Sequence, residues 1–262
     1  MVDIIFLVAL REGRDMGKFI AFMTDWGNTH YVAQAKAVIY GIKEDASIID
    51  ITHNVPAFDI RAGMHILYRI HRDFPKETVF LLVVDPGVGT DRKAIVGRFG
   101  DYYFVAPDNG IMSMIFREYG DDMEIFTIEN KEYFYLKEPT YTFHGRDIFA
   151  PVAAHVLRGV SLSEFGKPLE NPVMLDVFQP KWDGKHLKVE VAYVDGFGNV
   201  QLYLKDLPWD EKAYGQIWVR GYRATMARTY GDVPPGTMIF HRESSGFWEI
   251  AVSGVMPLML SV

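Results

Sequence analysis

The stretch TVFLLVVDPGVGTDRKAIV, residues 78–96, decides the fold. Its first half is an unbroken run of apolar and β-branched residues, which is typical of a strand that is buried on both faces. The run ends at Asp85, and the chain then turns through PGVG before it reaches Arg92. A carboxylate therefore stands at the end of a core strand, with a guanidinium close behind it.

The chain around this stretch alternates between strand patterns and helix patterns. Such alternation is typical of a mainly parallel sheet that is covered by helices through right-handed crossovers. The predicted elements are strands over 19–25, 47–53 and 78–85, helices over 30–43 and 58–74, a hairpin over 94–107, and helices over 111–119 and 146–158.

The second half of the chain shows strand patterns only. Around residues 168–185 the periodicity gives way to Pro, Asn and Gly, which indicates a domain boundary. Short strand-like runs follow, separated by turn residues: HLKVEVAYVD, GNVQLYL, GQIWVRGY, TMIFHRE and GFWEIAV. We therefore predict an N-terminal α/β domain over 19–178 and a C-terminal antiparallel β-barrel over 184–262, preceded by an extension over 1–18.

The composition narrows the class of function. A net charge of −7 argues against a nucleic-acid partner, because phosphate binding needs clustered Lys and Arg. The absence of cysteine excludes disulfides and thiolate metal sites and suits a cytoplasmic protein. The first 18 residues fit neither a signal peptide nor a membrane span. A small-molecule ligand is therefore expected.

Polar residues end three of the predicted strands: Asp25, His53 and Asp85. Polar residues often follow strands simply because loops are polar, but ligands of open α/β sheets also bind outside the carboxyl ends of the strands. Asp25 stands beside Gly27 at a strand-to-helix turn. Its carboxylate could accept hydrogen bonds from two vicinal ribose hydroxyls or could cap the following helix.

His144 lies in the aromatic turn PTYTFHGRDIFAP, ahead of a predicted helix. A lone histidine is more often structural, but this one has possible companions in Asp85 and Arg92. Together these three side chains could hold one water molecule, whose pKa the arginine would lower while the histidine and the aspartate orient it or take its proton. Such a set generates a nucleophile without a metal.

Two hairpins in the second half could also face a ligand. VDGFGNV, residues 194–200, has the composition of a tight turn and would expose Asp195, Phe197 and Asn199. ESSGFWEIAV, residues 243–252, places Ser244 at a hairpin tip, and Glu249 interrupts the apolar alternation of the strand that follows. Periodicity alone explains both segments as structure.

Six motifs, taken in order and spacing, resemble the S-adenosyl-L-methionine (SAM) hydroxide adenosyltransferases. These are adenosine-forming hydrolases related to the fluorinating and chlorinating enzymes that use the same substrate. The resemblance extends from Phe19 to Val262. The motifs are FMTDWG, DITHNVPAFDI, VVDPGVGTDR, APDNGI, TFHGRDIFAP and VDGFGNV.

The resemblance assigns roles to individual residues. It implies that Asp85, Arg92 and His144 hold the attacking water and that Asp25 binds the ribose. The remaining implied substrate contacts are Phe58 and Phe197 as aromatic walls, Asn199 at the methionine end with Asp195 beside it, and Ser244, Glu249 and Val252 near the adenine edge. The ending SGVMPLMLSV departs from the Asn- and Arg-rich ending that the family suggests.

The resemblance also implies an activity and an assembly. It implies hydrolysis of SAM to adenosine and L-methionine by in-line attack of water at the ribose C5′, without a cofactor. Halide-using relatives carry hydroxyl-bearing residues in place of Asp85 and His144, so the charged set favours water as the nucleophile. The implied assembly is a homotrimer whose sites lie between the N-terminal domain of one subunit and the C-terminal domain of the next.

Two other functions fit parts of the pattern. A metal-dependent phosphohydrolase could use strand-end ligands, although Arg92 would be an awkward neighbour for a cation. Its candidate ligands are Asp25, His53, Asp85, Asp108 and His144. A non-catalytic module could bind adenosine or SAM without turnover.

Overall fold

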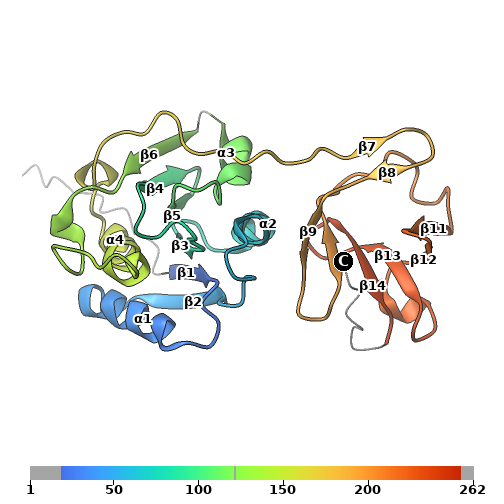
Figure 1. Cartoon of the computed structure of the whole chain (residues 1–262), viewed down its shortest axis with the longest axis horizontal. Helices are drawn as coiled ribbons and strands as arrows, with labels where there is room; N and C mark the ends of the chain where they lie inside the picture. Colours follow the sequence, from blue (N-terminus) through green and yellow to red (C-terminus); the bar gives the residue numbers. More distant parts are fainter. Residues whose placement is uncertain (1–18, 121, 255–262) are drawn as a thin grey trace, which may run out of the picture.

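The computed structural model describes residues 19–254 except residue 121, and these residues form two domains (Figure 1). The predicted extension over 1–18 and the last residues of the predicted second domain, 255–262, lie outside the described residues. No helix in the described ranges is long and apolar enough to cross a bilayer.

The first domain contains a six-stranded, mainly parallel sheet, as the alternating pattern predicted. Strand β1 pairs in parallel with β2 and β3, and β3 pairs in parallel with β5, whereas β4 is antiparallel to both of its neighbours. Strand β6 was not predicted. In the sheet order β2-β1-β3-β5-β4-β6, the strands are β2 (Ser47–Thr52), β1 (Phe19–Thr24), β3 (Val79–Val83), β5 (Tyr102–Pro107), β4 (Ala94–Phe99) and β6 (Met123–Thr127).

Helices cover both faces of this sheet (Figure 1). They are α1 (His30–Ile42), α2 (Ile60–Ile70), α3 (Ser113–Tyr119) and α4 (Ala150–Leu157), and a π-helical turn, Gly145–Phe149, leads into α4. Side chains of α1 and α4 share one core cluster, and side chains of α2 and α3 share the other. In β3, Leu81 belongs to the first cluster and its neighbours Phe80 and Leu82 to the second, so the strand is buried on both faces.

The second domain contains a six-stranded sheet that is antiparallel except where β12 pairs with β13. An all-antiparallel arrangement was therefore wrong at this pairing. Strands β12 and β13 are joined by a long connection that includes the 3₁₀ turn Tyr230–Asp232. A short hairpin would make the two strands antiparallel, but a long connection allows them to run in the same direction. In the order β11-β12-β13-β14-β10-β9, the strands are β11 (Gln216–Val219), β12 (Tyr222–Met226), β13 (Met238–Arg242), β14 (Trp248–Val252), β10 (Val200–Leu202) and β9 (Val191–Val194).

The described strands do not close this sheet into a hydrogen-bonded barrel. Its order ends at β11 on one side and β9 on the other. Its core is a separate cluster that includes Leu202, Phe240, Trp248 and Ile250. The segment that joins the two domains carries the short pair β7 (Lys181–Trp182) and β8 (Leu187–Lys188), and it spans the space between them in Figure 1.

The two domains meet along helix α2. Arg61, near the beginning of this helix, forms an ion pair with Glu190 at an Nη1 to Oε1 distance of 2.7 Å. One turn later, the His65 ring lies 5.2 Å from the ring of Tyr203. Arg69 follows after a further turn and also reaches into the second domain. One face of a single helix therefore supplies the main polar contacts between the domains.

His65 is buried at this domain interface without a hydrogen-bond partner. Its side chain is 1% exposed, and neither ring nitrogen has a partner among the described residues. Burial, followed by the positive charges of Arg69 and Arg61, lowers the pKa of His65 from 6.5 to about 4. The imidazole is therefore neutral at neutral pH.

The folded-state pKa of His65 predicts a pH-dependent stability. Since the unfolded chain takes up this proton near pH 6.5 and the folded chain only near pH 4, the free energy of unfolding decreases as the pH falls through this window. The shift corresponds to roughly 3 kcal/mol. The variant His65→Phe should lose this part of the pH dependence when urea unfolding is measured at pH values between 7 and about 4. The exposed His30→Phe variant is the control, and equal slopes for wild type and His65→Phe would refute the assignment.

Candidate functional site

Asp85, Arg92 and His144 form one hydrogen-bonded cluster beyond the carboxyl end of β3. Arg92 Nε donates to Asp85 Oδ1 at 2.9 Å and to Oδ2 at 3.0 Å, and Arg92 Nη2 donates to Oδ2 at 2.5 Å. The same Nη2 lies 2.8 Å from His144 Nδ1. The Asp85 and Arg92 side chains are only 5% and 10% exposed, so this ion pair is well shielded from solvent.

The arginine determines the tautomer of His144. A guanidinium can only donate, so His144 Nδ1 must accept this hydrogen bond, and a neutral ring then carries its proton on Nε2. Burial, followed by the positive charge of Arg92, lowers the pKa of His144 and keeps the ring neutral. His144 therefore offers a donor, Nε2–H, on the side of the ring away from Arg92.

Two glycines allow the loops of this cluster to approach each other. Gly89, in the turn between Asp85 and Arg92, has a φ of +77°, and a Cβ there would lie 2.4 Å from the carbonyl oxygen of Tyr141. A Cβ on Gly145, next to His144, would lie 2.4 Å from Cζ2 of Trp26. Larger residues at either position would push the His144 loop away from the strand ends.

Asp147 shapes the loop that carries His144, and sequence reasoning missed it. Its carboxylate is fully buried and accepts hydrogen bonds from the backbone N–H and the hydroxyl of Thr140, at 2.8 and 2.6 Å. Arg146 Nε donates to its other oxygen at 2.6 Å. The sequence did contain a signal for this role, an aspartate at the start of the apolar run DIFAP. An aspartate that is buried with such a run needs hydrogen-bond partners nearby.

Asp25 lies close enough to Asp85 for their charges to interact. Burial raises the pKa of Asp25, and the charge of Asp85 adds to this effect, whereas the N–H of Phe58 opposes it by donating to Asp25 Oδ2 at 2.8 Å. Phe58 has a positive φ of 65°, and its side chain is 69% exposed. The helix-capping interpretation of Asp25 is wrong, because α1 begins after Thr29.

The other strand-end residue, His53, points elsewhere. Its Nδ1 lies 2.9 Å from Thr24 Oγ1, and its Nε2 lies 3.1 Å from Asp50 Oδ1. Asp108 is also engaged away from the cluster, because its Oδ1 accepts from the N–H of Val173. Across the described ranges, no group of three or more acidic, histidine or cysteine side chains is arranged to hold a metal ion. The predicted phosphohydrolase ligand set is therefore not assembled.

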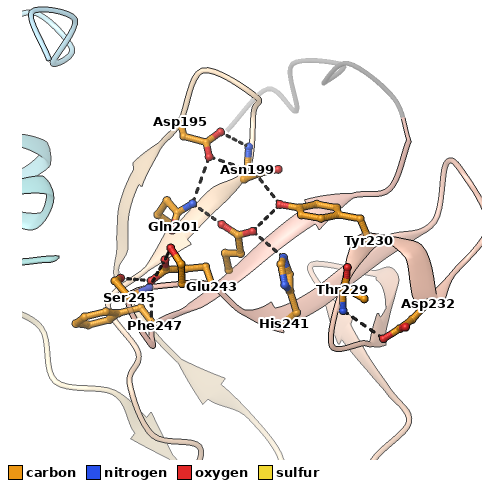
Figure 2. Close-up of polar contacts among 12 residues, drawn as sticks. Asp195, Asn199, Gln201, Thr229, Tyr230, Asp232, His241, Glu243, Ser245 and Phe247 are labelled. Atoms are coloured by element: carbon orange, nitrogen blue, oxygen red, sulfur yellow. Dashed lines mark hydrogen bonds and ion pairs between the residues drawn. The ribbon is translucent and has the colours of Figure 1, made fainter. Parts of the chain in front are cut away.

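A second group of predicted site residues lies in the loop between β9 and β10 (Figure 2). Asp195 Oδ1 accepts from the N–H groups of Phe197 and Asn199, both at 2.9 Å, and Oδ2 accepts from Asn199 Nδ2 at 3.0 Å. These bonds close the tight turn that the sequence predicted. They leave the Phe197 side chain 77% exposed.

Glu249 lies on β14, where it pairs with Gln201 of β10, and it is buried. Tyr230 donates its hydroxyl hydrogen to Glu249 Oε1 at 2.7 Å, Gln201 Nε2 donates to Oε2, and His241 Nε2 lies 2.6 Å from Oε1. Burial alone would raise the pKa of Glu249, but these contacts outweigh burial and lower it. The carboxylate is thus ionised and fully engaged within the domain.

The other two residues assigned to the adenine edge lie farther along this sheet. Ser244 stands at the exposed tip of the β13-β14 hairpin, where its hydroxyl donates to Glu243 Oε2 at 3.4 Å. Val252 ends β14 and pairs with Met238. The adenine-edge roles of Ser244, Glu249 and Val252 stay predictions.

The structure thus assembles the candidate residues in two groups. The group in the first domain contains Asp25, Phe58, Asp85, Arg92 and His144. The group in the second domain contains Asp195, Phe197, Asn199 and Glu249. Within the described part of this single chain, no hydrogen bond, ion pair or ring contact connects the two groups.

Comparisons with known proteins cover both domains. The family model of the SAM hydroxide adenosyltransferase N-terminal domain matches residues 20–166, and that of the C-terminal domain matches residues 189–254. The chain is 36% identical over 246 residues to the (R)-S-adenosyl-L-methionine hydrolase of Salinispora tropica, covering 90% of each chain. It is 28% identical over 269 residues to the fluorinase of Nocardia brasiliensis, covering 88% of this chain and 89% of that one.

A solved structure has the same fold. The crystal structure of an uncharacterized conserved protein from Thermotoga maritima superposes with a TM-score of 0.83 at 48% sequence identity. The match covers 89% of this chain and 92% of that chain, so it includes both domains.

Proposed function

Because the chain belongs to the SAM hydroxide adenosyltransferase family, we propose that it hydrolyses SAM to adenosine and L-methionine. The observation that carries this proposal is the shielded cluster of Asp85, Arg92 and His144. It offers an anionic acceptor, a permanent positive charge and a neutral imidazole donor within one hydrogen-bonded cluster. These are the groups that hold and polarise a water molecule.

In the proposed reaction, the water oxygen attacks the ribose C5′ in line with the bond to sulfur. The C5′–O bond forms as the C5′–S bond breaks, and the electron pair of that bond passes to the sulfonium sulfur. Methionine therefore leaves as a neutral thioether, and the water becomes the 5′ hydroxyl of adenosine after it loses one proton. Because a positive charge disappears from the sulfur, a site shielded from water favours the reaction.

The tautomer of His144 indicates which role each member of the cluster has in the proposed reaction. Its Nε2–H donates to the water oxygen and leaves a lone pair free to attack, so His144 orients the water. The carboxylate of Asp85 retains lone pairs beyond those that Arg92 uses and accepts the proton. Arg92 stabilises the negative charge that develops on the water oxygen. Asp25 uses Oδ2 for Phe58 and has Oδ1 available for a ribose hydroxyl.

Hydrolysis in ¹⁸O-water tests this proposal directly. Protein treated to remove metals is incubated with SAM, and the products are analysed by mass spectrometry. We expect free methionine and adenosine that carries the label at its 5′ oxygen, because water attacks C5′. Unlabelled adenosine incubated under the same conditions controls for exchange. Tight binding of SAM without any product would instead establish the non-catalytic module.

Variants of the cluster test the roles of its members. His144→Ala and Arg92→Ala should each lower kcat for SAM hydrolysis by about 10²–10³-fold, the range for losing one preorganised hydrogen-bond donor or charge. His155→Gln is the control, since it removes an imidazole on α4 whose ring lies against Tyr133. Circular dichroism and thermal unfolding establish that each variant is folded. A folded His144→Ala protein with wild-type kcat would contradict the role of His144.

We further propose that a complete site combines the two groups across a homotrimer, the first group from one subunit and the second from the next. The two groups are unconnected within one chain, and each presents an aromatic side chain to solvent, Phe58 at 69% exposure and Phe197 at 77%. Covering two such rings by a neighbouring subunit would supply the dry aromatic surface that a nucleoside needs.

Mixed trimers distinguish a shared site from a site within one chain. His144→Ala disrupts the first group and Asn199→Ala the second, so each variant alone should have low activity at SAM concentrations below the wild-type KM. After the two are unfolded and refolded together in equal amounts, about a quarter of sites would contain both groups intact if sites lie between subunits. We expect hydrolysis to return to that level, and size-exclusion chromatography with light scattering to give the mass of a trimer. No recovery in mixed trimers would place each site within a single chain.

A further inference from the structure

Arg69 brings a buried positive charge from the first domain into the second. It lies near the end of helix α2, and its side chain is only 4% exposed. Its guanidinium stacks over the ring of Phe247 at 4.4 Å, and Nη2 donates to the backbone oxygen of Leu202 at 2.8 Å. Nη1 lies 3.3 Å from Glu243 Oε1, which supplies the balancing negative charge. This cation is therefore held rigidly from several sides.

The same nitrogen of Arg69 determines how the amide of Gln201 is turned. Nη1 donates to Gln201 Oε1 at 2.6 Å. A guanidinium has no acceptor, so only the oxygen of the amide can face it, and the NH₂ group must point the opposite way. Gln201 is 5% exposed, which leaves the amide no solvent to turn toward.

The NH₂ group of Gln201 then meets two carboxylates, one from Asp195 in the β9-β10 loop and one from Glu249 on β14. Nε2 donates to Glu249 Oε2 and to Asp195 Oδ2, the latter at 3.4 Å. A turned amide would place its oxygen against both carboxylates and lose both bonds. Figure 2 shows the contact between the side chains of Gln201 and Asp195. The orientation imposed by Arg69 is thus the one that supports Asp195.

The two carboxylates in turn orient Asn199. Asn199 Nδ2 donates to Asp195 Oδ2 at 3.0 Å and to the hydroxyl oxygen of Tyr230 at 3.1 Å. Tyr230 can accept there because it donates its own hydrogen to Glu249. Both amide hydrogens of Asn199 are therefore engaged, and its Oδ1 is left as the acceptor that the side chain presents to a ligand.

We propose that Arg69 is a positioning residue for substrate binding, which acts through Gln201 on Asp195 and Asn199. This inference rests on the proposed function, since it concerns the substrate contacts of the second group. Arg69 touches neither Asp195 nor Asn199. It acts on them by fixing which end of the Gln201 amide donates and which accepts a hydrogen bond. Helix α2 thereby aligns the substrate-binding loop of the second domain while it joins the two domains.

The test compares KM and kcat for SAM in Arg69→Met, Gln201→Met and the double variant. Each single variant should raise KM about 10-fold, the size expected for weakening one hydrogen bond that involves a charged group. The kcat should stay within about 2-fold, since the Asp85 cluster is untouched. The double variant should be no worse than Gln201→Met, because both changes interrupt the same chain of contacts.

Arg61→Met is the matched control. It removes an arginine from the same helix that also forms an ion pair across the domain interface, with Glu190, but has no contact with Gln201. Its KM should equal that of the wild type. Thermal unfolding of all variants separates a loss of stability from a loss of substrate affinity.

Several results would overturn the proposal. A lower melting temperature with unchanged KM in Arg69→Met would make Arg69 a purely structural contact, and additive effects in the double variant would show that it acts independently of Gln201. Should Arg69→Met not fold, Gln201→Met with unchanged KM overturns the proposal equally. Calorimetric binding of SAM to His144→Ala protein, with and without the Arg69→Met change, reports the same comparison with little turnover. A failure of hydrolysis itself therefore stays distinguishable from a failure of this inference.

Discussion

The candidate active site depends on one shielded ion pair, between Asp85 and Arg92. A buried charge is costly unless it is paired and hydrogen-bonded, so the carboxylate at the end of β3 and the guanidinium beyond the glycine turn require each other. Because Arg92 is a donor only, its remaining hydrogen bond selects the tautomer of His144 and leaves Nε2–H available. The charge and the direction of every group in the cluster thus follow from the placement of a single arginine.

Helix α2 supports one group of site residues at its beginning and the other near its end. At its beginning, Phe58 holds the carboxylate of Asp25, and Asp59 caps the helix by accepting from the N–H of Ala62. Near its end, Arg69 holds Gln201 in the second domain. A helix is stiff over this length, so the residues at its two ends keep a constant separation and direction. The domain interface therefore contributes to the geometry of both halves of the site as well as to stability.

The misses of sequence reasoning share one cause. Strands β12 and β6 were not predicted; each is a run of only five residues, YRATM and MEIFT, and each is stabilised by pairing with a partner strand. Periodicity did not show that the Glu249 carboxylate is buried by polar partners from other strands, and its adenine-edge role, which rests on the family resemblance, stays a prediction. His53 ends a strand like Asp85, but its Nδ1 contacts the hydroxyl of Thr24, 29 residues earlier in the chain. Such outcomes depend on residues distant in the chain.

The sequence by itself determined the layered α/β domain and the change to an antiparallel-rich sheet, while the resemblance to a known family indicated that Asp85, Arg92 and His144 belong together. The first two features are local, since a strand buried on both faces must be continuously apolar and a tight turn requires glycine. Only the tertiary structure decided the tautomer of His144, the burial of Glu249 and the link from Arg69 to Gln201. Hydrogen-bond direction and burial are set by which side chains meet in space, and the spacing of residues along a chain carries no record of those meetings.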